Sequence, residues 1–226
     1  MSVFQLSYDL GFPPPYLSEP NGLLCVGGDL SSKRLLLAYA NGIFPWYSDD
    51  EPILWWSPDP RLVIYPGKIK ISKSLKKKLK KNYFKITMDT AFKDVIHACA
   101  DSRTQKNEET WLLEEMINAY IELYDQGFAH SVECWKGKEL AGGLYGISLG
   151  RCFFGESMFS YISDASKVAL VSLSDYLFNL DFDLIDCQVT SKHLISMGGL
   201  EIPRKEFLSI LKLSLQKPGI IKKWTY

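Results

Sequence analysis

The chain has 226 residues, of which 46% are hydrophobic and 13% aromatic, which indicates a globular protein with a substantial core and excludes a disordered chain. Lysine plus arginine and aspartate plus glutamate both number 26, so the net charge is zero, an average that hides one strongly basic segment. The five cysteines form no CxxC pair and the three histidines are isolated, so we expect no disulfide framework and no metal site.

The cysteines and the first residues predict a cytoplasmic protein. An odd, scattered set of cysteines fits a reducing compartment. The first ten residues lack a basic segment followed by an apolar run, so no signal peptide is expected. No apolar run approaches the roughly 18 residues of a transmembrane helix, so we expect no membrane association.

Residues 1–62 predict a small N-terminal module rich in tryptophan and proline. Residues 1–20 are typical of a loop, and Asp29 or Ser31 can cap a helix that ends near Asn41. The segment 42–61 contains three tryptophans and four prolines, so it must be fixed by aromatic packing. Its rings form either the wall of an apolar pocket or a small core. We favour a mixture in which most rings are structural and one lines a pocket.

The segment 68–85 contains nine lysines and no acidic residue. After a short strand over 62–65, a helix is predicted from Ser72, with Leu75 and Leu79 on one face. Such a charge run is usually a plain solvated face. In a neutral chain we favour a surface that binds nucleic-acid phosphates, without base readout.

The rest of the chain predicts an α+β fold. Residues 86–88 form a strand, 91–99 a helix, and Thr110 caps a helix that runs to Tyr124. A three-stranded antiparallel meander then covers 130–135, 139–147 and 151–159. Its glycines at 142, 143 and 146 indicate that something approaches the backbone closely. The remaining predicted elements are a helix over 165–178, a strand over 184–189, helices over 193–197 and 207–215, and a tail of strand or coil.

Three polar residues inside apolar strands are candidates for chemistry. Glu156 is a lone carboxylate among aromatic and sulfur-containing residues, where it needs a cation or hydrogen-bond donors. The alternative is a glutamate on an edge strand that faces water. Asp186 and Gln188 are two residues apart, so on a strand they share a face, with Cys187 on the other. Together they can orient an amine or polarise a carbonyl, or Gln188 can merely satisfy Asp186 in a core network.

Short blocks distributed over nearly the whole chain form one ordered set. They are EPNGLL at 19–24, GGDL at 27–30, GIFPW at 42–46, WWSPDPR at 55–61, TW at 110–111, AHSVE at 129–133, GGLYG at 142–146, GESMFS at 155–160, ASK at 165–167 and IDCQ at 185–188. Taken together, these blocks resemble the bacterial leucyl/phenylalanyl-tRNA–protein transferases.

The resemblance implies an enzyme that moves Leu or Phe, and Met less well, from aminoacyl-tRNA to proteins that begin with Arg or Lys. The product is a degradation signal of the N-end rule pathway. It also implies a GNAT-like acyltransferase domain over 63–226, with a central, mostly antiparallel sheet flanked by helices and the basic helix at 68–85. We expect no cofactor and a monomer. An acyl-CoA-dependent GNAT-type enzyme, a non-catalytic RNA-binding module and a cell-wall aminoacyl-tRNA ligase are the alternatives.

The resemblance also assigns site residues. The family's central polar pair falls on Asp186 and Gln188. From their shared strand face, our own hypothesis is that Asp186 holds and polarises Gln188 and attracts the acceptor amine, and that Gln188 accepts or relays its proton. The substrate pocket falls on Trp46, Trp111, Leu144, Phe153, Glu156 and Met158, and the tRNA-binding residues are Lys73, Lys77 and Lys80. Leu144 stands where relatives commonly have Met, and Ser191 stands where an Asn often follows the DCQ block.

Overall fold

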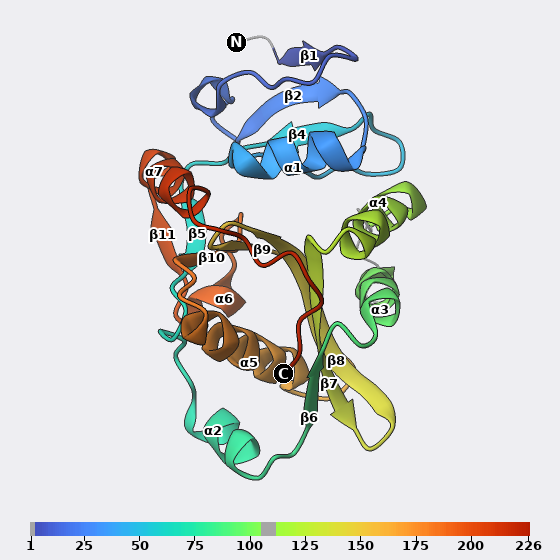
Figure 1. The fold of residues 1–226 in the computed structure, drawn as a ribbon, viewed down its shortest axis with the longest axis vertical. Coiled ribbons are helices and arrows are strands. Elements are labelled where there is room, and N and C mark those ends of the chain that lie inside the picture. Colours follow the sequence, from blue (N-terminus) through green and yellow to red (C-terminus); the bar gives the residue numbers. More distant parts are fainter. Residues whose placement is uncertain (1–2, 105–111) are drawn as a thin grey trace.

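A computed structural model describes residues 3–104 and 112–226. Within these ranges the strands form two sheets, one of order β1-β2-β4-β3 and one of order β11-β5-β10-β9-β8-β7-β6 (Figure 1). The mixed α+β class predicted from the sequence is confirmed. No helix in these ranges is long and apolar enough to cross a membrane.

The small sheet belongs to the N-terminal part of the chain. Its elements are β1 (Phe4–Leu6), a 3-10 turn (Pro15–Leu17), β2 (Leu23–Gly27), α1 (Ser32–Ala40), β3 (Phe44–Pro45) and β4 (Leu54–Trp56). Ser31 caps α1, because its hydroxyl accepts a hydrogen bond from the backbone N–H of Arg34. The loop predicted for residues 1–20 is wrong in part, since β1 pairs in parallel with β2. No apolar alternation marks β1, because it is mostly exposed.

The large sheet contains the predicted meander. Its strands are β5 (Arg61–Ile64), β6 (Lys85–Met88), β7 (Ala129–Lys136), β8 (Glu139–Leu149), β9 (Cys152–Ser160), β10 (Leu184–Asp186) and β11 (Leu200–Ile202). The pairing is antiparallel except between β9 and β10. The sequence did not predict β11, and β10 is shorter than the predicted strand because it ends at Asp186.

Helices cover both faces of this sheet. They are α2 (Lys73–Lys80), α3 (Phe92–Thr104), α4 (Glu114–Asp125), α5 (Ala165–Asn179), α6 (Lys192–Ser196) and α7 (Arg204–Ser214). Figure 1 shows α3 and α4 on one side of the meander and α5 on the other. The predicted cap at Thr110 lies outside the described residues, and the predicted tail is coil.

Two hydrophobic cores follow from the period-two pattern of the strands. Phe154 and Tyr145 face the core under α3 and α4, which continues into the N-terminal module through Tyr39. Their neighbours Phe153 and Leu144 face the second core, under α5. Adjacent strand residues point to opposite faces of a sheet, so one pair of strands serves both cores.

The glycines of β8 accommodate the protein itself. A Cβ atom at Gly146 would lie 2.1 Å from the carbonyl oxygen of Phe154, and one at Gly142 would lie 2.6 Å from the Cβ atom of Ala165. The close approach predicted at these positions is therefore made by β9 and α5. The hydrogen-bond register between β8 and β9 also shifts next to Gly146.

Candidate active site

A cavity of about 280 Å³ opens between β9, α5 and the segment that joins β10 to α6. Apolar side chains predominate in its wall, which is formed by Leu144, Tyr145, Phe153, Gly155, Glu156, Ser157, Met158, Leu170, Leu173, Ile185, Cys187, Gln188, Val189, Ser191, His193 and Leu194. Five predicted site residues therefore meet here, although they come from separate strands and a loop. They are Leu144, Phe153, Glu156, Met158 and Gln188.

Glu156 lies at the centre of a chain of hydrogen bonds. The Tyr120 hydroxyl donates to Glu156 Oε2 at 2.8 Å, and Gln188 Nε2 donates to Glu156 Oε1 at 2.9 Å. Tyr39 Oη lies 2.6 Å from Tyr120 Oη. Since β9 lies in the interior of the sheet and this carboxylate is held by two donors, the alternative of an edge glutamate facing water is wrong.

Burial raises the pKa of Glu156 to about 7, while hydrogen bonds from Tyr120 and Tyr39 act in the opposite direction. Desolvation disfavours the charged form of a carboxyl group, and donors directed at its oxygens favour it. A group with this pKa changes its charge close to neutral pH. Titratable groups perturbed in this way, lying in a cavity, are frequent in active sites.

Asp186 is held by a buried arginine. Arg61 Nε and Nη2 donate to the two carboxylate oxygens of Asp186 at 2.8 and 2.6 Å, and both side chains are 0% exposed. Arg61 also donates to the carbonyl oxygen of Gly42 at 3.1 Å. Its guanidinium also contacts the rings of Phe44 and Phe207, with its Cζ atom 4.9 and 4.5 Å from their centroids. The Asp186 carboxylate is thus paired and does not line the cavity.

The shared strand face predicted for Asp186 and Gln188 is wrong. β10 ends at Asp186, and Gln188 has a φ of 56°, in the left-handed region. The backbone N–H of Gln188 donates to Asp186 Oδ1 at 2.9 Å, while its side chain turns away to Glu156. Asp186 therefore holds the backbone of Gln188, and the amide reaches the cavity. Cys187, expected on the opposite face, lines the same cavity.

Of the two predicted tryptophans, Trp46 lies within the described residues and is not part of the cavity wall. Trp46 is 42% exposed and does not line the cavity, and its carbonyl oxygen accepts a hydrogen bond from Trp56 Nε1. Trp111 lies outside the described residues. Ser191, noted as a departure from the family pattern, lines the cavity.

The end of the chain supports the cavity from behind. The Trp224 ring is buried and lies 5.7 Å from the ring of Phe153, which lines the cavity. The Trp224 ring also stacks in parallel on the ring of His130, with 3.8 Å between ring centroids. Asp89 fixes both partners, because its Oδ2 accepts from the backbone N–H of Trp224 and contacts His130 Nδ1.

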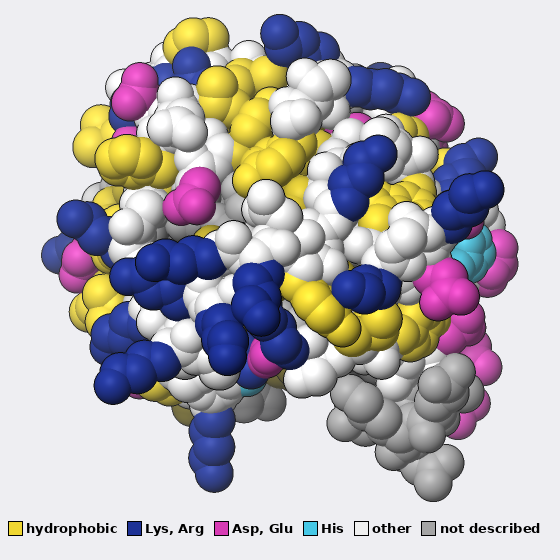
Figure 2. Space-filling model, turned by 90° about the horizontal axis from the view of Figure 1, so that it is seen from below, with side chains coloured by type: hydrophobic (Ala, Val, Ile, Leu, Met, Phe, Trp, Pro, Cys, Tyr) yellow, Lys and Arg dark blue, Asp and Glu magenta, His cyan; other side chains and the backbone are white. Residues whose placement is uncertain are grey.

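The basic helix has the predicted form. Ser72 caps α2 by accepting a hydrogen bond from the N–H of Leu75, and Leu75 is buried in the core under α5. A shallow surface groove is lined, within the described part of the chain, by five lysines, and these are Lys73, Lys76, Lys77, Lys80 and Lys81. Figure 2 views the molecule from the α2 end and shows lysine and arginine side chains gathered on this face.

Sequence reasoning assigned no role to Arg61, Tyr120 or Tyr39. Arg61 had no local signal, because a charged residue at the start of a strand is usually exposed and its partner lies 125 positions away. The two tyrosines had none either, since each occupies an ordinary apolar position of an amphipathic helix.

Two family models match the chain. The model described as leucyl/phenylalanyl-tRNA protein transferase matches residues 63–212, and the model of the N-terminal domain of the same enzymes matches residues 28–59. The chain belongs to the leucyl/phenylalanyl-tRNA–protein transferase family. It is therefore a transferase enzyme, as the ordered sequence blocks predicted.

Named relatives agree over the full length. A leucyl/phenylalanyl-tRNA–protein transferase of Desulforapulum autotrophicum is 58% identical over 226 residues, which cover 100% of this chain and 99% of the relative. One of Syntrophobacter fumaroxidans is 58% identical over 211 residues, 93% of this chain and 90% of the relative.

The similarity to solved structures is weak. A conserved protein of unknown function from Bacteroides thetaiotaomicron is 12% identical, with a TM-score of 0.43, over 74% of this chain and 58% of that chain. This score is too low to assign a fold, so the GNAT-like architecture stays a prediction.

Proposed function

We propose that this enzyme moves Leu or Phe, and Met less well, from aminoacyl-tRNA to the N-terminal Arg or Lys of acceptor proteins, which creates an N-end rule degradation signal. The observation that carries the proposal is the apolar cavity with a carboxylate and an amide in its wall. An apolar cavity suits the Leu or Phe side chain of the donor. The carboxylate and the amide suit the amino groups of the donor and the acceptor, which must both lie near the aminoacyl ester.

The cavity selects the donor side chain by size. Leu144, Phe153 and Met158 would contact this side chain, together with Leu170 and Leu173 of α5. Apolar pockets discriminate by about 1–3 kcal/mol per methylene. We therefore expect a graded preference among Leu, Phe and Met, with no absolute choice.

The reaction requires positioning more than a strong base. The acceptor amine forms a bond to the ester carbonyl carbon, the bond from that carbon to the ribose oxygen breaks, and the amine proton passes to the released ribose oxygen. An α-amino group with a pKa of about 7.7–8.0 is partly free at neutral pH. Holding the two reactants in place can supply about 7–11 kcal/mol.

The polar residues divide this work. We place Glu156 near the cationic acceptor or the α-amino group of the donor, because its carboxylate is half-buried in an apolar wall. Gln188 donates through Nε2 to Glu156, so its Oε1 is oriented to accept a hydrogen bond from the attacking amine or to relay its proton. Asp186 acts through Gln188, whose backbone it holds.

The lysines of α2 would bind the tRNA. Lys73, Lys77 and Lys80 belong to the lysine groove and present ammonium groups to phosphates without any base contact. Such binding weakens with salt, with a log–log slope of about −0.7 to −0.9 for each phosphate contacted.

The finer expectations about the fold and the cell belong to the same proposal. We propose an N-terminal module over residues 1–62, followed by a GNAT-like catalytic domain over residues 63–226. We also propose that the protein is a cytoplasmic monomer. The GNAT-like assignment rests on the family resemblance, the cytoplasmic location on the scattered cysteines, and the N-terminal module on its tryptophan and proline content.

The decisive experiment incubates the enzyme with labelled Leu-tRNA and a peptide that begins with Arg. Label should appear in the peptide, and a matched peptide that begins with Ala should remain unlabelled. If neither peptide is labelled, the proposed transfer is wrong. Release of free CoA from an acyl-CoA with the same peptide would instead support the acyl-CoA-dependent alternative.

A variant of Glu156 tests the contact with the acceptor. Glu156→Gln should raise KM for Arg- and Lys-started peptides if Glu156 binds the acceptor cation. Glu139→Gln is the matched control, since Glu139 lies exposed at the start of the neighbouring strand β8. An unchanged KM would remove the acceptor role of Glu156 and leave its role toward the donor amine.

A further inference from the structure

The lysine helix α2 is attached to the rest of the protein along one narrow face. Among the residues of α2, all of which are described, Leu75 alone is buried, with 1% exposure. Leu79 and Lys78 are half-buried. These three positions, at i, i+3 and i+4, lie on one side of a helix. Lys78 therefore points toward the protein, whereas the lysines of the groove face solvent.

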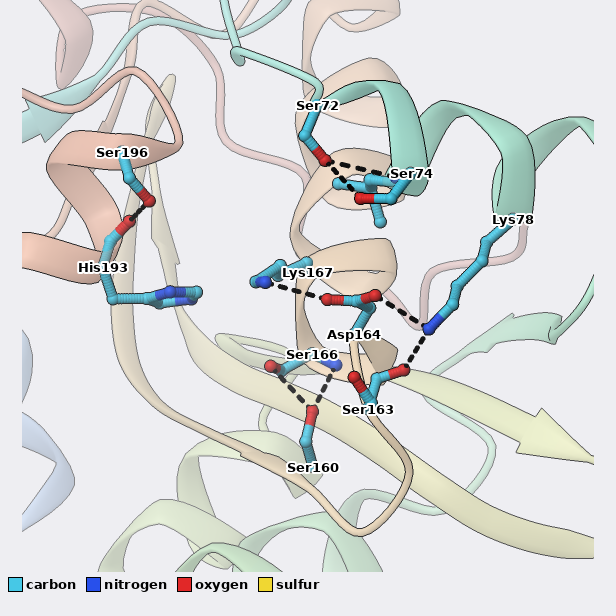
Figure 3. A network of polar contacts seen from close by, with 11 residues as sticks. Ser72, Ser74, Lys78, Ser160, Ser163, Asp164, Ser166, Lys167, His193 and Ser196 are labelled. Carbon is cyan, nitrogen blue, oxygen red and sulfur yellow. Dashed lines mark hydrogen bonds and ion pairs between the residues drawn. The ribbon is translucent and has the colours of Figure 1, made fainter.

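The ammonium group of Lys78 donates hydrogen bonds to two groups of the protein. Its Nζ atom donates to Asp164 Oδ2 at 2.8 Å and to the carbonyl oxygen of Ser163 at 2.9 Å. The second carboxylate oxygen of Asp164 accepts from Lys167 Nζ, also at 2.8 Å (Figure 3). The hydrogen bonds from Lys167 and Lys78 lower the pKa of Asp164 below its ordinary value. One carboxylate thus joins α2 to α5.

Asp164 lies on the segment that connects two walls of the cavity. It directly precedes α5, which contributes Leu170 and Leu173 to the cavity. The strand β9 ends four residues earlier, at Ser160, whose hydroxyl accepts from the backbone N–H of Ser166 in the first turn of α5. A contact to Asp164 therefore fixes α2 against the same unit of chain that shapes the cavity.

The proposed donor must touch both places at once. Its aminoacyl group would enter the cavity while the phosphates of its acceptor stem meet the lysine groove. Binding energy from the stem helps the reaction only when both parts fit in one fixed geometry. An α2 helix held by two leucines alone could tilt on α5, and an ion pair beside them would restrict that motion.

We propose that Asp164 is a positioning residue, whose ion pair with Lys78 sets the orientation of α2 relative to the cavity so that the stem and the aminoacyl end of the donor bind in register. The proposal rests on the function proposed above. It assigns Lys78 a role different from that of the other lysines of α2, because its charge is engaged by Asp164 and does not meet a phosphate.

Asp164→Asn is the informative variant, because two explanations predict opposite signs. If lysine charge alone controlled tRNA binding, loss of an acid would free Lys78 and Lys167 and lower KM for Leu-tRNA. If the ion pair orients α2, KM for Leu-tRNA should rise by about twofold to fivefold, the range that a partly exposed pair can supply. Asp164 has a φ of 71°, a left-handed conformation that Asn also adopts, so the variant should fold.

Asp181→Asn provides the matched control. Asp181 is exposed, also left-handed, with a φ of 55°, and its substitution changes the net charge by the same amount. The donors to compare are Leu-tRNA and leucyl-adenosine, which lacks the stem. We expect Asp164→Asn to raise KM for Leu-tRNA only, with kcat unchanged, and Asp181→Asn to raise neither KM. A lowered or unchanged KM for Leu-tRNA, or an equal rise for both donors, would overturn the proposal.

A second variant checks the role of Lys78 itself. Lys78→Met should raise KM for Leu-tRNA while the salt dependence of that KM keeps its slope. A slope smaller by about 0.7–0.9 would mean that Lys78 contacts a phosphate and would refute the proposal. Transfer by the wild-type enzyme is measured first: its absence overturns the proposed function and this inference with it, whereas normal transfer without these effects overturns the inference alone.

Discussion

The pH dependence of kcat/KM offers a sharp test of Glu156. This parameter reports the pKa values of the free enzyme and the free substrate, so the ligand-free geometry is the relevant one. The pKa of Glu156 is raised by burial to about 7. Its two oxygens accept hydrogen bonds from Tyr120 and Gln188, an arrangement made for the ionised carboxylate. We therefore expect the ionised form to be the active one.

The expected change is large enough to measure. With a pKa of about 7, the ionised fraction of Glu156 rises from about 10% at pH 6 to about 90% at pH 8, a roughly ninefold gain. The acceptor amine, with a pKa of about 7.7–8.0, must lose its proton before it attacks and adds a second limb. Below about pH 6.5, a plot of log kcat/KM against pH should thus rise with a slope near two.

Glu156→Gln removes one of these two ionisations. Initial rates of transfer to an Arg-started peptide are measured at low substrate from about pH 5.5 to 8.5. Log kcat/KM should rise with a slope near one below the pKa of the acceptor amine and level off above about pH 8. Glu139→Gln should keep the slope near two. A Glu156→Gln enzyme that keeps this steeper slope would show that another group titrates, and the role given to the carboxylate would be refuted.

Tyr120 supplies an internal check on the cause of the shift. Its hydrogen bond lowers the pKa of Glu156, so Tyr120→Phe should move the Glu156 limb to higher pH. A limb that moves to lower pH would contradict the direction derived from this hydrogen bond.

Three further predictions concern other parts of the molecule. Asp186→Asn should lower the free energy of unfolding, measured in urea, by about 3–5 kcal/mol, because Arg61 is left buried without its carboxylate. The double variant Arg61→Met with Asp186→Leu should recover part of this loss. Equal losses in both variants would contradict the pairing argument. Lys77→Met should reduce the salt slope of KM for Leu-tRNA by about 0.7–0.9, and an unchanged slope would remove Lys77 from the phosphate contacts. Leu144→Met changes the shape of the cavity wall at nearly constant volume, so it should change the ratio of kcat/KM for Phe-tRNA to that for Leu-tRNA by less than about tenfold. Equal effects on both donors would place Leu144 away from the bound side chain.

The stability of the Asp186 variants determines how their activity can be read. A loss of transfer in Asp186→Asn alone would not separate chemistry from unfolding, because the carboxylate is fully buried against Arg61. Activity should therefore be measured at a temperature where urea unfolding shows the variant to be folded. Under that condition a kcat close to the wild-type value would refute the proposed action of Asp186 through Gln188.

The meander and the helix that follows it could be predicted because their information is local. Phe153 and Phe154 are adjacent apolar residues in a strand, so they had to face two cores, and the structure has a core on each side. The lysine helix could also be predicted from the local sequence, because Ser72 caps it and Leu75 marks the face that packs on the protein.

The details of the site could not be predicted, because they depend on contacts between distant residues. The left-handed conformation of Gln188 follows from the end of β10 and from its bond to Asp186, and nothing in the local sequence marks it. The Arg61–Asp186 pair joins residues 125 positions apart. The tryptophan segment was predicted as a mixture of roles, and Trp55 is structural, with Nε1 bound to the Gly27 carbonyl oxygen.

The position of β10 between β5 and β9 has a consequence for the order of folding. β9 belongs to the meander, whose strands are close in sequence, whereas β5 comes from the first third of the chain. Contacts between distant residues form slowly, because the entropy of closing a long loop is lost before the contact stabilises the chain. The meander can thus assemble early, and the cleft appears only when β5 and β10 join it. Before β10 pairs with β9, the cavity lacks the wall that Cys187 and Gln188 form, so a partly folded chain could not hold an aminoacyl group.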